Sequence, residues 1–405
     1  MKKTVNEYVK KVLMNYNLKK GHAKEKRGGI CMELSKSQNK RKRCIKLNSP
    51  VYVENSASIV GPKEGTSYFV EGFDRVCEDP FLGMDSWEEA ESELQREALN
   101  ILMDKANVTE EEIDCIFSGD LLSQTTASSY GLLSFGIPNY GIYGACSNCG
   151  ATLALGAVLL SGGYAEKVVA MTSSHFGSAE KEFRFPLGYG AQRPLSATWT
   201  VTGCGAFLLA RGESASIGSS VGKTADGAGN ADAQVAGNRR GKKKQKEHKV
   251  CISHIVMGEI VDSGLKDAQN MGGCMAPAAA LTIGSALREL SYSLDDYDQI
   301  ITGDLGEVGS TALYDLLSLE GFDIKEKHSD CGLLIYDREK EDVHAGGSGC
   351  GCSATMLSAY VLRKLRDGEW KRVLFVPTGA LLSKLRSEEG MSIPCIAHGV
   401  VLESC

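Results

Sequence analysis

Cys146 is the residue of this 405-residue chain whose type and setting best suit a covalent nucleophile. It lies in "GIYGACSNCGATLALGAVLL" (residues 141–160), where a turn of small residues leads into an apolar helical pattern. The positive end of a helix dipole stabilises a thiolate at the helix N-terminus, and a neighbouring imidazole usually completes the activation. The question is whether Cys146 reacts or whether the chain keeps the position without the reaction.

Histidines are the residues that could activate this thiol. His175 is the best placed, because it directly follows the β-branched run "KVVAMTSS" (167–174). Alternatively, His175 is a loop residue whose ring is fixed by hydrogen bonds and which takes no part in a site. His398 opens the last predicted strand and is expected to be structural, whereas His328 and His344 lie in polar turns and are expected to be solvated.

Two close cysteine pairs, Cys146/Cys149 and Cys350/Cys352, could also bind a metal or exchange disulfides. A structural zinc site needs four ligands at paired spacing, and neither pair has a matching second half nearby. We therefore expect no metal and no cofactor.

The charge is divided unevenly along the chain. Residues 1–48 carry a net charge of +12 and the remainder carries −18. The acidic body argues against nucleic-acid binding, and the basic stretch 1–48 is typical of a disordered tail. A second stretch, 217–249, is rich in Gly, Ala, Asn and Lys and is expected to be a disordered insertion.

We find neither a signal peptide nor an apolar run long enough to span a membrane, so we expect at most peripheral membrane association.

The rest of the sequence alternates β-branched runs with helical patterns, which predicts an α/β fold. One such helix is expected at 86–106, with Ser86 as its N-cap, and one short strand at "GLLIYD" (332–337). Three segments of the first half recur in order in the second half: 113–122 as 297–306, 144–174 as 347–380, and 203–211 as 397–405. This internal repeat predicts a duplicated α/β unit with halves at 49–216 and 250–405. It also predicts a site where the N-termini of two equivalent helices meet.

A duplicated α/β unit with a cysteine at the start of its central helix resembles the thiolase fold, a layered αβαβα architecture with two mixed, mostly parallel sheets. Longer motifs narrow the resemblance to the stage V sporulation protein AD family. These motifs include "VGPKEG" (60–65), "SGDLLSQ" (118–124), "YGACSNC" (143–149), "EFRFPLGYGAQRP" (182–194), "QNMGGCMAPAAA" (269–280), "DYDQIITGDLGEVG" (296–309) and "GGSGCGCSA" (346–354). The resemblance covers residues 49–405 apart from the insertion.

The resemblance implies a non-catalytic protein that binds dipicolinic acid (pyridine-2,6-dicarboxylate). Such a protein works with small membrane proteins of the same sporulation complex, peripherally at the cytoplasmic face of the forespore and spore inner membrane. Its expected roles are dipicolinate uptake during sporulation and release in germination.

The same resemblance bears on catalysis. Thiolase-superfamily enzymes place imidazole or amide groups at two turns that correspond here to Asp304 and Ser348, and a second cysteine where this chain has Thr378. An anionic Asp304 would oppose carbanion formation. Cys146 is then a relic nucleophile position, and the alternative is a thiolase- or ketoacyl-synthase-like acyltransferase that uses Cys146.

Dipicolinate is a flat dianion, so its site should offer N–H donors or a guanidinium and a flat apolar wall. The two predicted helix starts supply the residues expected around it: Cys146, Ser147, Gly347, Ser348, Gly349 and Cys350, with His175 as a further candidate. Arg184 is a candidate carboxylate clamp, or else an ion-pair partner of Glu180 or Glu182, and Tyr189 with Phe185 could form the wall.

Two acids fit a dianion poorly. Asp120 and Asp304 are expected to hold backbone, unless the ligand arrives as a calcium chelate that they coordinate. A scaffold that binds no small molecule is a third alternative for the function. By analogy with the superfamily, a homodimer is also allowed.

Overall fold

The computed structural model describes Lys10 and residues 42–184, 193–212 and 247–405. Most of the predicted tail, most of the predicted insertion, and Tyr189 with Phe185 lie outside these ranges. The described strands of the large mixed sheet are β1 (Cys44–Val60), β2 (Arg75–Val76), β3 (Cys115–Gly119), β4 (Asn139–Gly141), β5 (Lys167–Ser174), β7 (Gly203–Arg211), β8 (Val250–Val256), β9 (Gln299–Thr302), β10 (His328–Asp330), β12 (Arg372–Val376) and β15 (Gly399–Ser404). Two small sheets pair β6 (Trp199–Thr200) with β11 (Gly347–Ser348) and β13 (Thr378–Ala380) with β14 (Cys395–Ala397).

The large sheet consists of two equivalent halves. One half runs β4-β3-β5-β7-β1 and the other β10-β9-β12-β15-β8. In each half the first three strands are parallel and the last two are antiparallel to their neighbours. This matching order confirms the duplicated unit. The two predicted sheets are, however, joined into one hydrogen-bonded path, because β1 pairs with both β7 and β8.

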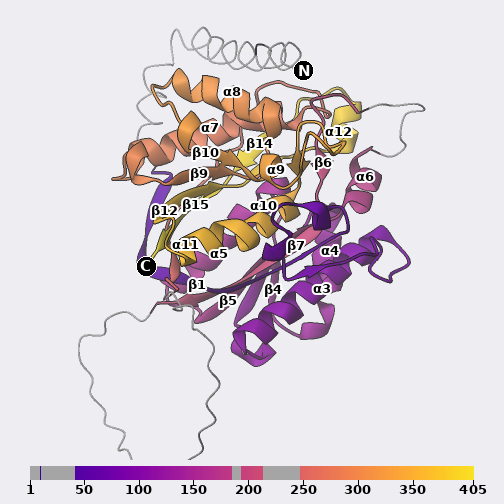
Figure 1. The fold of residues 1–405 in the computed structure, drawn as a ribbon, viewed down its shortest axis with the longest axis vertical. Helices are drawn as coiled ribbons and strands as arrows, with labels where there is room; N and C mark the ends of the chain where they lie inside the picture. Colours follow the sequence, from indigo (N-terminus) through magenta and orange to yellow (C-terminus); the bar gives the residue numbers. More distant parts are fainter. Residues whose placement is uncertain (1–9, 11–41, 185–192, 213–246) are drawn as a thin grey trace, which may run out of the picture.

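Helices form the layers around the two half-sheets (Figure 1). The described helices are α3 (Trp87–Ala106), α4 (Thr126–Gly131), α5 (Asn148–Ser161), α6 (Phe176–Arg184), α7 (Met271–Glu289), α8 (Gly306–Ser318), α9 (Cys331–Leu334), α10 (Cys350–Met356), α11 (Leu362–Arg366) and α12 (Lys384–Glu388). Helix α3 packs on the first half-sheet and α7 with α8 on the second, while α5 and α10 share a core with strands of both halves. The αβαβα layering places the N-terminal ends of α5 and α10 in the middle of the molecule.

Local sequence signals explain where several elements begin. Ser86 caps α3 as predicted, since its side chain accepts a hydrogen bond from the Glu89 N–H. The prediction of a strand at 332–337 is wrong: the Asp330 carboxylate accepts from the Leu333 N–H and starts helix α9 there. Strand β1 begins at Cys44 and so extends into the predicted tail, because its first residues pair with β8.

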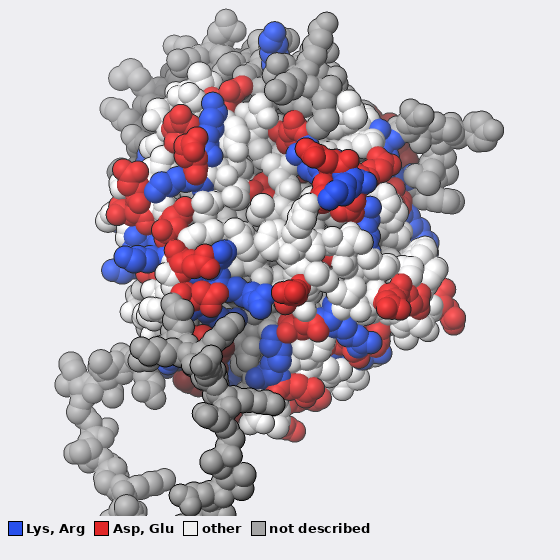
Figure 2. Space-filling model, in the orientation of Figure 1, with Lys and Arg blue, Asp and Glu red and all other residues white. Residues whose placement is uncertain are grey.

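Two further features concern the surface and the ends of the chain. A disulfide joins Cys405 to Cys251 on β8. None of the helices in the described ranges is long and apolar enough to cross a membrane. Figure 2 shows Lys and Arg interspersed with Asp and Glu over one face of the molecule, so that face offers no continuous basic patch to a polyanion.

Candidate functional site

Cys146 lies at the junction of the two halves. It occupies a 3-10 turn (Ala145–Ser147) that leads into α5, and Ala145 before it has a left-handed backbone with φ of 50°. The Ser147 hydroxyl donates to the Pro377 carbonyl (2.9 Å) and accepts from the His398 N–H (2.9 Å). These bonds tie the start of α5 to β13 and β15 of the second half.

Asp304 is the charged partner of the buried Cys146 thiol, which hydrogen-bonds to its carboxyl group. The carboxyl also accepts from the Gly349 N–H (2.9 Å) and from the Thr378 hydroxyl (2.7 Å). Burial, followed by the charge of Asp304, raises the pKa of Cys146 well above its ordinary value. Burial likewise raises the pKa of Asp304 to about 7. Both causes favour the protonated thiol over the thiolate that a nucleophile needs.

A cavity of about 210 Å³ opens beside this pair. Residues of both halves line it: Leu121, Ala145, Cys146, Ala179, Glu180, Phe183, Arg184, Arg193, Thr200, Ala268, Gln269, Met271, Ser348, Gly349, Ala380 and Leu382. Of the predicted site residues, Cys146, Arg184, Ser348 and Gly349 thus meet in one cavity. Asp304 lies behind it, bonded to Cys146.

Other predicted residues hold backbone instead of lining the cavity. The carboxylate of Asp120 accepts from the Leu122 N–H (2.8 Å) and from both the N–H and the hydroxyl of Ser128 (2.8 and 2.7 Å). The Cys350 thiol donates to the Ser173 carbonyl (2.8 Å). Gly347 pairs with Trp199 in the small β6–β11 sheet. Asp120 has the predicted structural role.

The helix-start amides are also largely occupied. The Ser147 N–H donates to the Gly144 carbonyl (3.1 Å), the Gly349 N–H to Asp304, and the Gly351 N–H to the Ser174 hydroxyl (3.1 Å). An anion in the cavity therefore finds few free N–H groups at these helix starts. Hydrogen bonds from side chains must contribute more to its binding than the sequence analysis expected.

Arg184 is not a free clamp. Its guanidinium forms an ion pair with Glu180 one turn earlier on α6, and both side chains are mostly buried, at 13% and 16% exposed. The alternative of an ion pair, which the sequence left open, is the arrangement in the structure.

His175 lies in a different place from the one expected of a base. Its Nδ1 accepts from the Gly177 N–H (3.0 Å), so its Nε2–H donates to the Pro80 carbonyl (2.8 Å). Burial lowers the pKa of His175. Both ring nitrogens are thus occupied, and the imidazole lines a second pocket instead of contacting Cys146.

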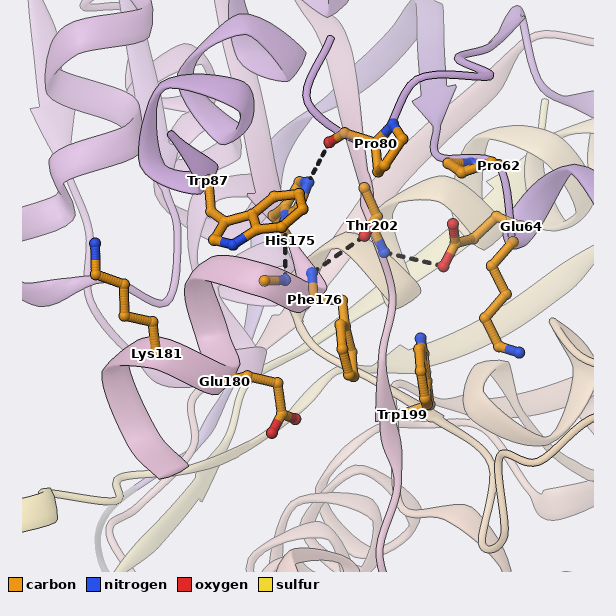
Figure 3. Close-up of a pocket in the computed structure, with 12 residues that line it drawn as sticks. Pro62, Glu64, Pro80, Trp87, His175, Phe176, Glu180, Lys181, Trp199 and Thr202 are labelled. Carbon is orange, nitrogen blue, oxygen red and sulfur yellow. Dashed lines mark hydrogen bonds between the residues drawn. The ribbon is translucent and has the colours of Figure 1, made fainter. Parts of the chain in front are cut away.

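This second pocket has a volume of about 680 Å³ (Figure 3). Glu180 lines both pockets. Its walls include Trp87, Phe176 and Trp199, with Phe176 stacked on Trp199 at 3.9 Å between ring centroids. Glu64 closes one side and accepts from the Thr202 N–H (3.0 Å).

Two further histidines, His328 and His398, hold other parts of the fold in place. His328, predicted to be solvated, is instead buried and hydrogen-bonds to Thr302 and Tyr314 (both 2.9 Å), and burial lowers its pKa to about 4. His398 accepts from the Gly258 N–H through Nδ1 (3.1 Å). No group of three or more His, Cys, Asp or Glu residues within the described ranges could hold a metal ion.

Sequence reasoning missed two polar residues of the Cys146 cavity, Arg193 and Gln269. Among the described residues, the buried Arg193 Nη1 and Gln269 Oε1 have no hydrogen-bond partner. Both residues lie in motifs that carry the family resemblance, "EFRFPLGYGAQRP" and "QNMGGCMAPAAA". That membership was the one signal that could have singled them out.

Comparisons with known proteins agree with this architecture. A family model described as "Stage V sporulation protein AD (SpoVAD)" matches residues 41–403. The chain is 38% identical over 354 residues to "Stage V sporulation protein AD" of Bacillus subtilis (strain 168), across 87% of this chain and 94% of that protein.

Solved structures share the fold at low sequence identity. "AbyA1 - tetronic acid condensing enzyme" matches with a TM-score of 0.53 and 18% identity over 88% of this chain and 100% of that chain. Cerulenin-bound OleA of Xanthomonas campestris matches with a TM-score of 0.50 and 12% identity over 88% and 99%. These likenesses confirm the predicted thiolase-like fold.

Proposed function

The chain belongs to the stage V sporulation protein AD family, and on that premise we propose that it binds dipicolinate without catalysis, in the Cys146 cavity. It acts with small membrane proteins of the same sporulation complex, peripherally at the cytoplasmic face of the forespore and spore inner membrane. There it serves dipicolinate uptake during sporulation and release in germination.

The observation that carries this proposal is the pairing of Cys146 with Asp304. A thiol nucleophile needs a partner that lowers its pKa, whereas burial and the Asp304 charge raise it. Both nitrogens of His175 are bonded elsewhere. A carboxyl group beside the thiol also opposes the enolate charge that a condensation would develop.

The cavity suits a small planar anion. At about 210 Å³ it is smaller than the roughly 300–1,000 Å³ of pockets for drug-sized ligands, which favours a single-ring molecule. Phe183, Met271 and Leu382 give apolar walls for a ring, and the Arg193 guanidinium in the lining suits a carboxylate. Asp304, whose pKa lies near 7, becomes neutral when a dianion approaches.

The alternative is a thiolase- or ketoacyl-synthase-like acyltransferase. The left-handed backbone at Ala145 favours it, because strained turns of this kind are common at catalytic nucleophiles. The third alternative, a scaffold without a small-molecule ligand, has no comparable observation in its favour.

Calorimetric titration of the full chain with dipicolinate tests the proposal. We expect saturable binding and a raised melting temperature, slow alkylation of Cys146 by iodoacetamide, and no acyl transfer from acyl-CoA. Cys146→Ala should fold and weaken binding about fivefold, equivalent to ~1 kcal/mol of lost contact. Rapid, pH-dependent alkylation of Cys146 with acyl transfer would establish the enzyme instead, and a melting temperature unmoved by dipicolinate would favour the scaffold.

A further inference from the structure

We infer that Arg193 and Gln269 together bind one carboxylate of a planar dicarboxylate in the Cys146 cavity and so select ligands that carry two carboxylates. This inference rests on the proposed function and adds the residues that determine its specificity. Two buried polar atoms without partners, both on side chains that line the same cavity, are the observation behind it.

Two contacts hold the guanidinium of Arg193 in place. It lies over the Trp199 ring, 4.7 Å from the ring centroid, and its Nη2 donates to the Asp342 carbonyl (2.5 Å). These contacts orient the planar group and leave Nη1 buried, with no hydrogen-bond partner among the described residues. A buried N–H without an acceptor costs free energy, which a carboxylate bound against the guanidinium would recover.

The charge of Arg193 is also less neutralised than that of Arg184. Among the described residues, the carboxylate that pairs with Arg193 belongs to Asp342, at 3.3 Å, and that side chain is 80% exposed and therefore well screened by water. Arg184 instead shares a mostly buried ion pair with Glu180. An anion in the cavity is consequently attracted more strongly by Arg193 than by Arg184.

Gln269 supplies the second group. Its backbone is fixed just before α7, where its N–H donates to the Asp267 carboxylate (3.0 Å) and its carbonyl accepts from the Ser196 hydroxyl (3.1 Å). Its side-chain Oε1 is buried without a partner. Rotation of the amide by half a turn places its NH₂ group where Oε1 lies, and that group donates to a carboxylate.

The two side chains come from separate parts of the sequence, one before β6 and one before α7. With Phe183 and Met271 as apolar walls, they define an end of the cavity that recognises a carboxylate on a flat ring. Thr200 and Ser348 also line the cavity and can offer hydroxyl donors to a second carboxylate. A ring with a single carboxylate cannot use both sets of donors at once, so it binds more weakly.

The experiment compares dipicolinate with picolinate, which is the same ring with one carboxylate, by calorimetry on the full chain. For Arg193→Gln we expect at least a tenfold loss of dipicolinate affinity, a much smaller loss for picolinate, and a chain that still unfolds cooperatively without ligand. Arg193→Lys keeps the charge without the planar fork and should recover only part of the loss. Gln269→Leu should weaken dipicolinate binding severalfold, and Arg211→Gln, which removes an exposed ion-paired arginine outside the cavity, should change neither ligand.

Different results would overturn the inference alone or the proposed function as well. Dipicolinate affinity of Arg193→Gln equal to that of the unmodified chain overturns the inference and leaves the proposed function standing. Equal losses for dipicolinate and picolinate also overturn it, since Arg193 would then act only through the general field of the site. Failure of the unmodified chain to bind dipicolinate removes the proposed function and the inference with it.

Discussion

At the scale of single residues, Asp304 decides what the Cys146 position can do. The same thiol beside an imidazole would ionise more easily, whereas beside a buried carboxyl it keeps its proton. Because burial brings the pKa of Asp304 to about 7, this carboxyl changes its charge near neutral pH. On the proposed function, its protonation state sets how well the cavity accepts an anion.

We predict that dipicolinate affinity depends on pH through Asp304. Below about pH 7 the carboxyl is neutral and tolerates a dianion, and above that pH each unit should reduce affinity up to tenfold as proton uptake becomes necessary. Asp304→Asn, which remains neutral and can still bond to Gly349 and Thr378, should flatten the profile. Titrations at pH 6, 7 and 8, in buffers of different ionisation enthalpy, measure both the affinity and the proton uptake. A profile that stays equally steep in Asp304→Asn would assign the titration to another group.

At the scale of elements, buried polar contacts connect the two halves of the fold. Glu64, in the turn after β1, accepts from the Thr202 N–H just before β7 (Figure 3). It also accepts from the hydroxyl of Tyr336 in the second half. Its Oε2 is buried without a partner among the described residues. Burial raises the pKa of Glu64 to about 7, so the folded chain favours the protonated acid.

We predict that Glu64→Gln makes the protein more stable at alkaline pH than the unmodified chain. A carboxyl whose pKa is raised on folding stabilises the fold at low pH, and this contribution is lost as pH rises towards and through 7. The shift from 4.5 to about 7 corresponds to about 3 kcal/mol. Urea unfolding at pH 5 and at pH 8.5 should show the advantage of Glu64→Gln growing with pH, and Glu54→Gln, at an exposed position on β1, should show no such growth.

Elements were predictable from the sequence where the signal was local or repeated. Ser86 marked the start of α3, and the internal echoes gave the matching order of the two half-sheets. The stretch 332–337 has the apolar content of a strand but becomes a helix, because the Asp330 side chain caps it. The proposed roles of Arg193 and Gln269 could not be derived in this way. They rest on buried side-chain atoms without a hydrogen-bond partner among the described residues, which only the folded structure reveals.

At the scale of the whole molecule, the two ends of the large sheet differ. Strand β10 ends one half and is buried or half-buried, whereas β4 ends the other half with all three residues exposed. Tyr140 on β4 is 58% exposed, although its ring stacks on Phe117, and Tyr143 and Leu133 nearby in the sequence are 47% and 77% exposed. An uncovered edge strand with large apolar neighbours is a template for pairing with another strand.

We predict that a second copy of the chain covers this edge, with β4 paired to its equivalent in a symmetric homodimer. The unmodified protein should therefore elute as a dimer in size-exclusion chromatography with light scattering. Tyr140→Lys places a charge on the edge and should shift the population to monomer without changing the melting temperature of the monomer core. Tyr164→Lys, at a position 83% exposed after α5, is the matched control and should remain dimeric. A monomeric unmodified chain, or dissociation in both variants alike, would exclude β4 as the dimer contact.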